Sequence, residues 1–242
     1  MTLKLSVTSN LDELTKYFTE LEKGQVPFAA SRAINAVAKI AQGDLRAEMG
    51  KVFDRPKPFT MNSLYVKNSN KRNLTATVGH KDQASNGTPA AEYLQSEISG
   101  GERKQTPFER IFGVFGNGAL VPTGAKRDRF GGVAKAERLG AIKGSEGNGN
   151  GYFVIKPGDS SHLKPGIYQR KSVRTRTRNS GLAGGKVAIG GGSTIRPIML
   201  YKPTTTYRPI YNMVGVVQNT INREFTSAFT NAMDQAMATA KR

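Results

Sequence analysis

The segment RKSVRTRTR at residues 170–178 constrains this chain more than any other part of the sequence. It places five positive charges in nine residues, and residues 156–208 hold 11 Lys/Arg against one acid, Asp159. The first 50 residues, by contrast, hold six Lys/Arg and six Asp/Glu and are neutral. A solvated basic face usually carries interspersed acids, so a block of one sign indicates a polyanion or an acidic protein surface as its partner.

The same segment has the alternation of a β-strand. From Val173 to Arg178 every second residue is an arginine, and residues of one parity share a face of a strand. Guanidinium groups on that face would stand about 6.6 Å apart, which suits phosphates as well as acidic side chains. An edge strand whose charges only prevent aggregation is the alternative. The predicted contacts to a partner or to DNA are Arg170, Lys171, Arg174, Arg176 and Arg178.

Composition limits the class of protein. The hydrophobic content of 37% and the 27 glycines indicate a modest core and long loops. No run of about 18 apolar residues is present, so no membrane span is expected, and the first ten residues lack the apolar stretch of a secretory signal. The chain has no cysteine, which excludes disulfides and thiol catalysis and suits a reducing cytosol.

Helical periodicity predicts two long helices, at 26–49 and 207–240. Gly24 is expected to end an earlier helix, and Pro27 suits the first turn of the next one. The C-terminal helix, with about 30 residues, would be about 45 Å long, so we expect part of its apolar stripe to pack on the other helix or on another subunit. The residues expected at this packing surface are Tyr211, Val214, Ile221, Phe225 and Phe229.

The rest of the chain favours short helices, strands and loops. Thr106 and Glu109 form a predicted capping box before a helix. Residues 116–151 look like a mobile loop, and the Gly/Asn run at 144–151 has almost nothing to bury. Residues 152–155 are a predicted strand, and 167–177, 186–189 and 197–202 are predicted strands of one antiparallel sheet, within a basic β region over 152–202. The expected fold class is α+β: two long helices packed on a mostly antiparallel β-sheet, with long Gly-rich loops, in a single domain over 1–242.

No pattern indicates catalysis, a metal or a cofactor. His80 and His162 lack metal-ligand spacing and are expected at the surface or in loops, and no G-x-S-x-G elbow occurs. Glycine runs at 184–186 and 190–194 do not fit a phosphate loop. The acids are scattered along predicted helix faces. We therefore expect a non-enzymatic protein without a cofactor.

Four blocks of sequence resemble, in order, segments of the phage minor tail protein Z family. They are KVFDRPKPFTMNSLYV at 51–66, GTPAAEYLQSEISGGERKQTPFER at 87–110, LVPTGAKRDRFGG at 120–132, and YFVI with LKPGIYQR at 152–155 and 163–170. The second block has the family's GG-x-R centre followed by an F-E pair, and the third is similar to its P-x-x-x-x-x-D-x-[YF]-G segment. Together the blocks cover roughly residues 26–212.

The resemblance implies a structural protein of a tailed-phage virion, acting at the head–tail junction (neck, connector or tail completion) as a subunit of a ring. It implies no catalytic residue. The expected partners are further copies in a homo-oligomeric ring, the portal-side adaptor, the tail-side rings and packaged DNA, with no membrane. The expected location is the virion, after assembly in the host bacterial cytoplasm.

Two other functions compete with a virion protein. A basic nucleic-acid-binding protein outside a virion, such as an RNA chaperone, would bind as a monomer with a steep salt dependence. A hydrolase acting on the cell wall would need paired carboxylates or metal ligands, and no such cluster is visible in the sequence.

Overall fold

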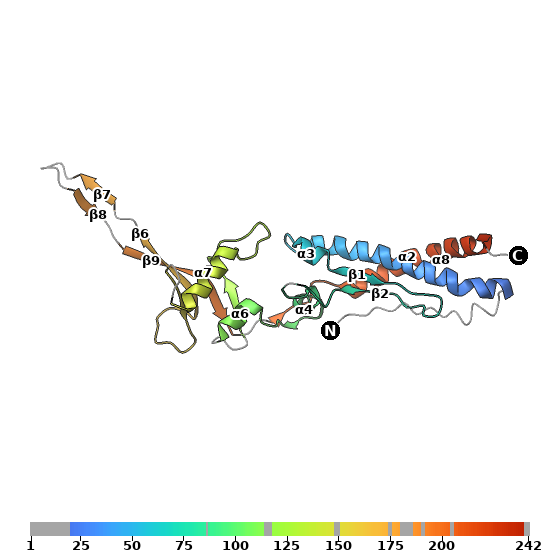
Figure 1. The fold of residues 1–242 in the computed structure, drawn as a ribbon, viewed down its shortest axis with the longest axis horizontal. Coiled ribbons are helices and arrows are strands. Elements are labelled where there is room, and N and C mark those ends of the chain that lie inside the picture. The colour runs from blue at the N-terminus through green and yellow to red at the C-terminus, as the bar shows by residue number, and fades with distance from the viewer. Residues whose placement is uncertain are drawn as a thin grey trace. The chain divides into compact units, whose positions relative to one another are not determined.

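A computed structural model describes residues 20–85, 87–113, 118–147, 151–173, 176–179, 186–189, 192–203 and 206–239. The chain divides into two compact units (Figure 1). Unit 1 comprises Met1–Gly101 and Tyr207–Arg242, and unit 2 comprises Glu102–Thr206. The chain passes between them at two short strands, β3 (Gly101–Glu102) and β10 (Thr206–Tyr207). The helices and antiparallel strands confirm the α+β class. The chain forms two compact units, whereas the sequence analysis expects a single domain.

Unit 1 is built on two long helices, α2 (Glu20–Val52) and α8 (Met213–Thr239), which pack along each other (Figure 1). At one end their contact consists of alanines, which let the two backbones approach closely: Ala29, Ala33, Ala232 and Ala236. Further along, larger side chains such as Leu45 and Val217 fill the core. Asp44 on α2 adds polar contacts, because it accepts hydrogen bonds from Thr220 at 2.7 Å and Arg223 at 2.8 Å on α8.

Helix α2 runs through Gly24 and Pro27, where the sequence analysis expects a break. Proline in a helix interior costs about 3 kcal/mol relative to alanine. The neighbouring Val26, Ala29 and Ala30 are fully buried, so tertiary packing outweighs this local penalty.

A hairpin and three short helices complete unit 1. Strands β1 (Leu64–Lys67) and β2 (Thr77–His80) pair antiparallel, with Leu64 opposite His80. Their residues Leu64 and Val78 join the core, and Gln42 on α2 donates a hydrogen bond to the Leu64 carbonyl at 2.8 Å. The short helices are α3 (Pro58–Met61), α4 (Ala90–Tyr93) and α5 (Gln95–Ser99).

Unit 2 contains a four-stranded antiparallel sheet in the order β4-β9-β6-β5. The strands are β4 (Ala119–Pro122), β5 (Tyr152–Ile155), β6 (Gly166–Val173) and β9 (Gly192–Lys202). Helices α6 (Pro107–Ile111) and α7 (Lys135–Ser145) lie beside the sheet (Figure 1). The core of unit 2 consists of Phe112, Leu120, Ala141, Ile167, Ile198 and Met199.

Two of these elements, β4 and α7, lie where the sequence analysis expects a loop over 116–151. Glycines suggested the loop, but Gly140 and Gly144 are helical residues of α7 that face Tyr152. A Cβ at Gly140 would lie 2.5 Å from the Tyr152 ring, and one at Gly144 would lie 2.5 Å from the Tyr152 Cβ. These glycines therefore allow α7 and β5 to approach each other closely.

Candidate functional site

The predicted basic strand belongs to a two-stranded ribbon that continues from the four-stranded sheet. Strand β5 pairs with β6 from Gly166 to Gln169, and β4 pairs with the last four residues of β9. The Arg170 amide still donates a hydrogen bond to the Gly151 carbonyl at 2.7 Å. From Lys171, opposite Thr194, to Val173, opposite Gly192, the described ladder joins β6 to β9 alone. In the described residues, the sheet is four strands wide at its base and two strands wide beyond Arg170.

The next ladder, β7 (Arg176–Asn179) with β8 (Lys186–Ile189), keeps the same register. Arg176 is opposite Ile189, so both strands advance by three residues from the pair Val173 and Gly192. Residues 174–175 and 190–191, which lie between the two ladders, are outside the described residues. We call the residues 170–173, 176–179, 186–189 and 192–195 the basic ribbon.

The structure brings most of the predicted contact residues onto this ribbon. Arg170 and Lys171 are exposed on β6, and Arg176 and Arg178 lie on β7. Arg174 lies outside the described residues. On the opposite strand, Ser193, Thr194 and Ile195 are exposed.

Aromatic and polar contacts anchor the base of the ribbon. The Arg170 guanidinium lies 5.5 Å from the centre of the Phe153 ring, which stacks on Tyr168 at 5.6 Å. Arg196 on β9 donates hydrogen bonds to Glu137 on α7 at 3.0 Å and to Gln169 on β6 at 2.9 Å. These contacts hold β6 and β9 in place at the base of the ribbon.

Glu137 is the centre of this polar cluster. Its residue is 3% exposed, and it accepts a 2.8 Å hydrogen bond from the Tyr152 hydroxyl. Burial acts to raise the pKa of Glu137, but the hydrogen bonds from Tyr152 and Arg196 outweigh it and lower that pKa overall. Burial, together with the hydrogen bond to Glu137, raises the pKa of Tyr152 to about 12. Glu137 therefore stays ionised and neutralises Arg196.

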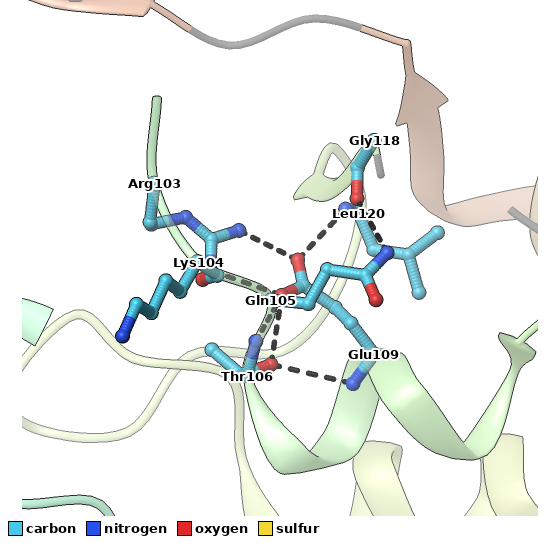
Figure 2. Close-up of polar contacts among 7 residues, drawn as sticks. All are labelled: Arg103, Lys104, Gln105, Thr106, Glu109, Gly118 and Leu120. Atoms are coloured by element: carbon cyan, nitrogen blue, oxygen red, sulfur yellow. Dashed lines mark hydrogen bonds and ion pairs between the residues drawn. The ribbon is translucent and has the colours of Figure 1, made fainter. Parts of the chain in front are cut away.

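A second buried carboxylate, Glu109, links four parts of unit 2 (Figure 2). Arg103 donates to both of its oxygens, at 2.6 and 2.9 Å. The Thr106 amide donates to it at 2.7 Å and the Leu120 amide at 2.9 Å, and Glu109 also completes the predicted capping box of α6 with Thr106. Burial acts to raise its pKa, yet these hydrogen bonds together lower it. Glu109 is therefore an ionised structural link.

The sequence analysis missed the ionic roles of both carboxylates, because it read the acids as charged helix faces. For Glu109 a signal was present, since the capping box fixes its side chain at the start of α6. For Glu137 none was available, because its partner Arg196 lies 59 residues away in the sequence.

The balance of charge differs between the units. Unit 2 has 19 Lys/Arg and six Asp/Glu, a net charge of +13, and unit 1 has 17 and 12, a net charge of +5. Glu109 and Glu137 are each neutralised by an arginine inside unit 2. The excess positive charge thus lies on other residues, and five of them belong to the basic ribbon.

His80 is buried, not at the surface as the sequence analysis expects. It is 3% exposed, and its Nδ1 lies 2.7 Å from the Ser63 hydroxyl. That hydroxyl also donates to the Thr60 carbonyl at 2.7 Å, so it accepts from His80, and Nδ1 carries the proton. Burial lowers the pKa of His80 to about 4. His80 is thus a neutral core residue of unit 1.

The residues predicted for subunit packing lie mainly inside unit 1. Tyr211 is fully buried and its hydroxyl donates to the Leu45 carbonyl at 3.3 Å. Ile221 and Phe225 pack against the same core, and Phe229 packs against the alanine cluster. Val214 is 50% exposed. The apolar stripe of α8 is therefore covered largely by α2, which is one of the two expected outcomes.

Other kinds of site find little support in the described ranges. No group of three or more His, Asp and Glu gathers there in a way that could hold a metal ion. A small apolar pocket lies between α2, β2 and α8 and has no titratable residue in its lining: Ile34, Val37, Ala38, Ala41, Ala76, Val78, Val217, Ile221 and Phe225. No described helix has the length and apolarity needed to cross a membrane.

Comparison of the chain with protein-family models, curated proteins and solved structures finds no match. The features that indicate a function are therefore the basic ribbon and the two buried ion pairs of unit 2.

Proposed function

We propose that this chain is a structural protein of a tailed-phage virion, acting at the head–tail junction as one subunit of a closed ring. The observation that carries the proposal is the basic ribbon. A two-stranded hairpin alone is at best marginally stable in water, and this one carries five cations and no acid among its described residues. Such an element gains stability when it contacts a negatively charged partner.

The sequence blocks that resemble the minor tail protein Z family fit a scaffolding role. In the second block, the arginine of the GG-x-R centre and the glutamate of the F-E pair are Arg103 and Glu109, which form the ion pair of Figure 2. In the third block, Asp128 accepts hydrogen bonds from the amides of Phe130 at 3.0 Å and Gly132 at 2.8 Å. The motif residues therefore maintain the fold, and a likeness in them implies a shared scaffold.

Ring formation is supported by apolar residues exposed on the two long helices of unit 1. Phe28 and Ile40 on α2 are 41% and 39% exposed, and Val214 on α8 is 50% exposed. In a ring with head-to-tail contacts, each subunit presents two different surfaces that are covered by its neighbours. We propose that these side chains contribute to such contacts, and that the neighbours in the virion are the portal-side adaptor and the tail-side rings.

Electron microscopy of virions tests this proposal. In a phage that carries the gene, we expect a ring of density between head and tail, and particles made without the protein should lack this ring and fail to infect. Expression of the wild-type chain from a plasmid serves as the control and should restore both. Native mass spectrometry of the purified protein should give a multiple of the 26.2 kDa chain mass that corresponds to several subunits, not to a monomer. Infectious, complete virions without the protein would disprove the proposal.

A nucleic-acid-binding protein outside a virion is the alternative that the basic ribbon also supports. This function predicts tight binding by a monomer and virions that are complete without the protein. The mass measurement and the deletion phage therefore separate the two functions.

A further inference from the structure

The chemical class of the partner of the basic ribbon can be inferred from the width and the residue types of the ribbon. We propose that the basic ribbon inserts into the major groove of double-stranded DNA and binds it without reading the base sequence. The proposal rests on the proposed function only in placing DNA within reach of the protein, since binding itself is a property of the isolated chain.

The width of the ribbon fits one groove of the duplex. Paired strands lie about 4.8 Å apart, and the major groove, about 12 Å wide, admits a two-stranded β-ribbon, whereas the minor groove is only about 6 Å wide. The four-stranded sheet at the base of the ribbon would be too wide for the major groove. In the described residues, the β5 edge bonds to β6 as far as Arg170, through Gly151, and the β4 edge bonds to β9 as far as Ile198, through Thr123. The described ladder beyond Arg170 therefore has the two-stranded width that the groove accepts.

The side-chain types of the ribbon are those that bind phosphates. Arginine, lysine, serine, threonine and asparagine make most protein contacts to the DNA backbone. Among the 16 described ribbon residues, five are cations, namely Arg170, Lys171, Arg176, Arg178 and Lys186. Five more are uncharged hydrogen-bonding residues, namely Ser172, Thr177, Asn179, Ser193 and Thr194. The same residue types can contact base edges in the major groove, but the concentration of positive charge favours contacts to phosphates, which do not depend on sequence. We therefore infer binding without base specificity.

Duplex DNA fits this set better than single-stranded nucleic acid does. Binding of single strands relies on aromatic rings that stack on the bases, and the ribbon contains no aromatic residue. At its base, Phe153 is already engaged by Tyr168 and Arg170.

Duplex DNA also fits better than an acidic protein. Protein interfaces concentrate their binding energy in a few anchors, most often Trp, Tyr and Arg seated in pockets, and the ribbon lacks the aromatic anchors. DNA, in contrast, presents one negative charge per about 1.7 Å of axis at every position.

Fluorescence anisotropy with the full-length protein tests the inference. The probes are a labelled 30-base-pair duplex, the single strand (dT)30 and labelled poly-glutamate, each titrated between 50 and 200 mM salt. We expect the duplex to bind at least tenfold more tightly than the other two. Methyl green, which occupies the major groove, should compete with the protein, and netropsin, which occupies the minor groove, should not.

Matched variants assign the binding to the ribbon. The variant R176Q/R178Q removes two ribbon charges, and K135Q/K143Q removes two exposed charges from α7. Each lost phosphate contact lowers the slope of log K against log salt by about 0.9, so R176Q/R178Q should lower it by about 1.8. The control should leave the slope unchanged, and R176K/R178K should restore it. Circular dichroism verifies that each variant is folded.

Several results would overturn the inference. They are equal affinity for (dT)30 and the duplex, tighter binding of poly-glutamate, competition by netropsin alone, or an equal loss of slope in K135Q/K143Q. Failure here leaves the virion ring of the proposed function intact, because that is measured in particles. Conversely, duplex binding by a protein that virions do not need would disprove the proposed function and leave this inference standing.

Discussion

Unit 1 and unit 2 are stabilised by different kinds of contact. The buried polar residues described in unit 1 are neutral at pH 7, namely Ser31, Ser63, Ser69, His80, Ser96 and Thr220. They accompany a core of aliphatic side chains and alanines between α2 and α8. Unit 2 has a smaller apolar core and adds two buried glutamates, each paired with an arginine.

The difference shows how unit 2 combines a stable fold with a large excess of positive charge. Its buried acids are neutralised by Arg103 and Arg196 at the core, so they do not compensate the cations of the ribbon. The positive charges of the ribbon are therefore not neutralised by these two acids. In unit 1 the net charge is only +5, and the exposed apolar residues on its helices are the feature that we assign to contacts between subunits.

Loss of apolar packing in unit 1 should lower the free energy of unfolding more than any other change, and the destabilisation should be confined to unit 1. Leu45 is fully buried, so Leu45→Ala should lower the free energy of unfolding by about 3.5 kcal/mol through the cavity it leaves. Hydrogen exchange should show lower protection in α2 and α8 and unchanged protection in β6 and β9. Ile40→Ala, at a 39% exposed position of the same helix, is the control and should cost less than about 1 kcal/mol. Equal deprotection of both units would show that they unfold together.

Removal of one buried charge should destabilise unit 2 by a slightly smaller amount. Glu109→Gln leaves Arg103, with a side chain that is 19% exposed, without its carboxylate, and breaking a buried pair in this way costs about 3 kcal/mol. Deprotection is expected in α6, β4 and β9, while α2 and α8 stay protected. The exposed neighbour Glu102 provides the control variant Glu102→Gln, which should have no measurable effect. An unchanged unfolding free energy for Glu109→Gln would contradict the structural role of the ion pair.

Acid should weaken unit 1 through His80. Burial lowers its pKa from 6.5 to about 4, so between these values the unfolded chain binds a proton that the folded chain does not. Stability is therefore lost as the pH falls from 6.5 to 4, by up to about 3 kcal/mol at about 1.4 kcal/mol per pH unit. His80→Phe should remove this part of the pH dependence.

Denaturant titrations at several pH values measure the effect. His162→Gln, at an exposed position of unit 2, is the matched control and should retain the full dependence. A His80→Phe profile that runs parallel to that of the wild type would contradict the assignment.

Glycine-to-alanine substitutions should change the stability of the two units in opposite directions. In unit 2, Gly144→Ala would place a Cβ 2.5 Å from Tyr152 Cβ and 2.7 Å from its carbonyl oxygen, and such overpacking should cost about 2 kcal/mol. In unit 1, an added Cβ at Gly43 of α2 meets no atom within 4 Å. Gly43→Ala should therefore stabilise the chain by about 0.5–1 kcal/mol. Thermal unfolding of both variants tests the pair, and a stabilising Gly144→Ala would contradict the close approach of α7 and β5.

The sequence predicted those features that depend on neighbouring residues. Strands were predicted at 152–155 and 186–189, and both are present as β5 and β8. The capping box of Thr106 and Glu109 is also confirmed. The sequence analysis did not predict the course of α2 through Pro27, because packing against α8, which is distant in the sequence, decides it. It did not predict α7 either, because the role of Gly140 and Gly144 becomes evident only when Tyr152 packs against them.

By itself, the sequence determined the α+β class, the position of the basic segment and the absence of cysteine chemistry, because periodicity and charge are local properties of the chain. Only the tertiary structure decided that the chain forms two units, that Glu109 and Glu137 are buried against arginines, and that the described part of the sheet narrows to two strands beyond Arg170. These features depend on which distant segments meet. Each such contact contributes free energy only when both partners are in place, so a local sequence pattern cannot reveal it.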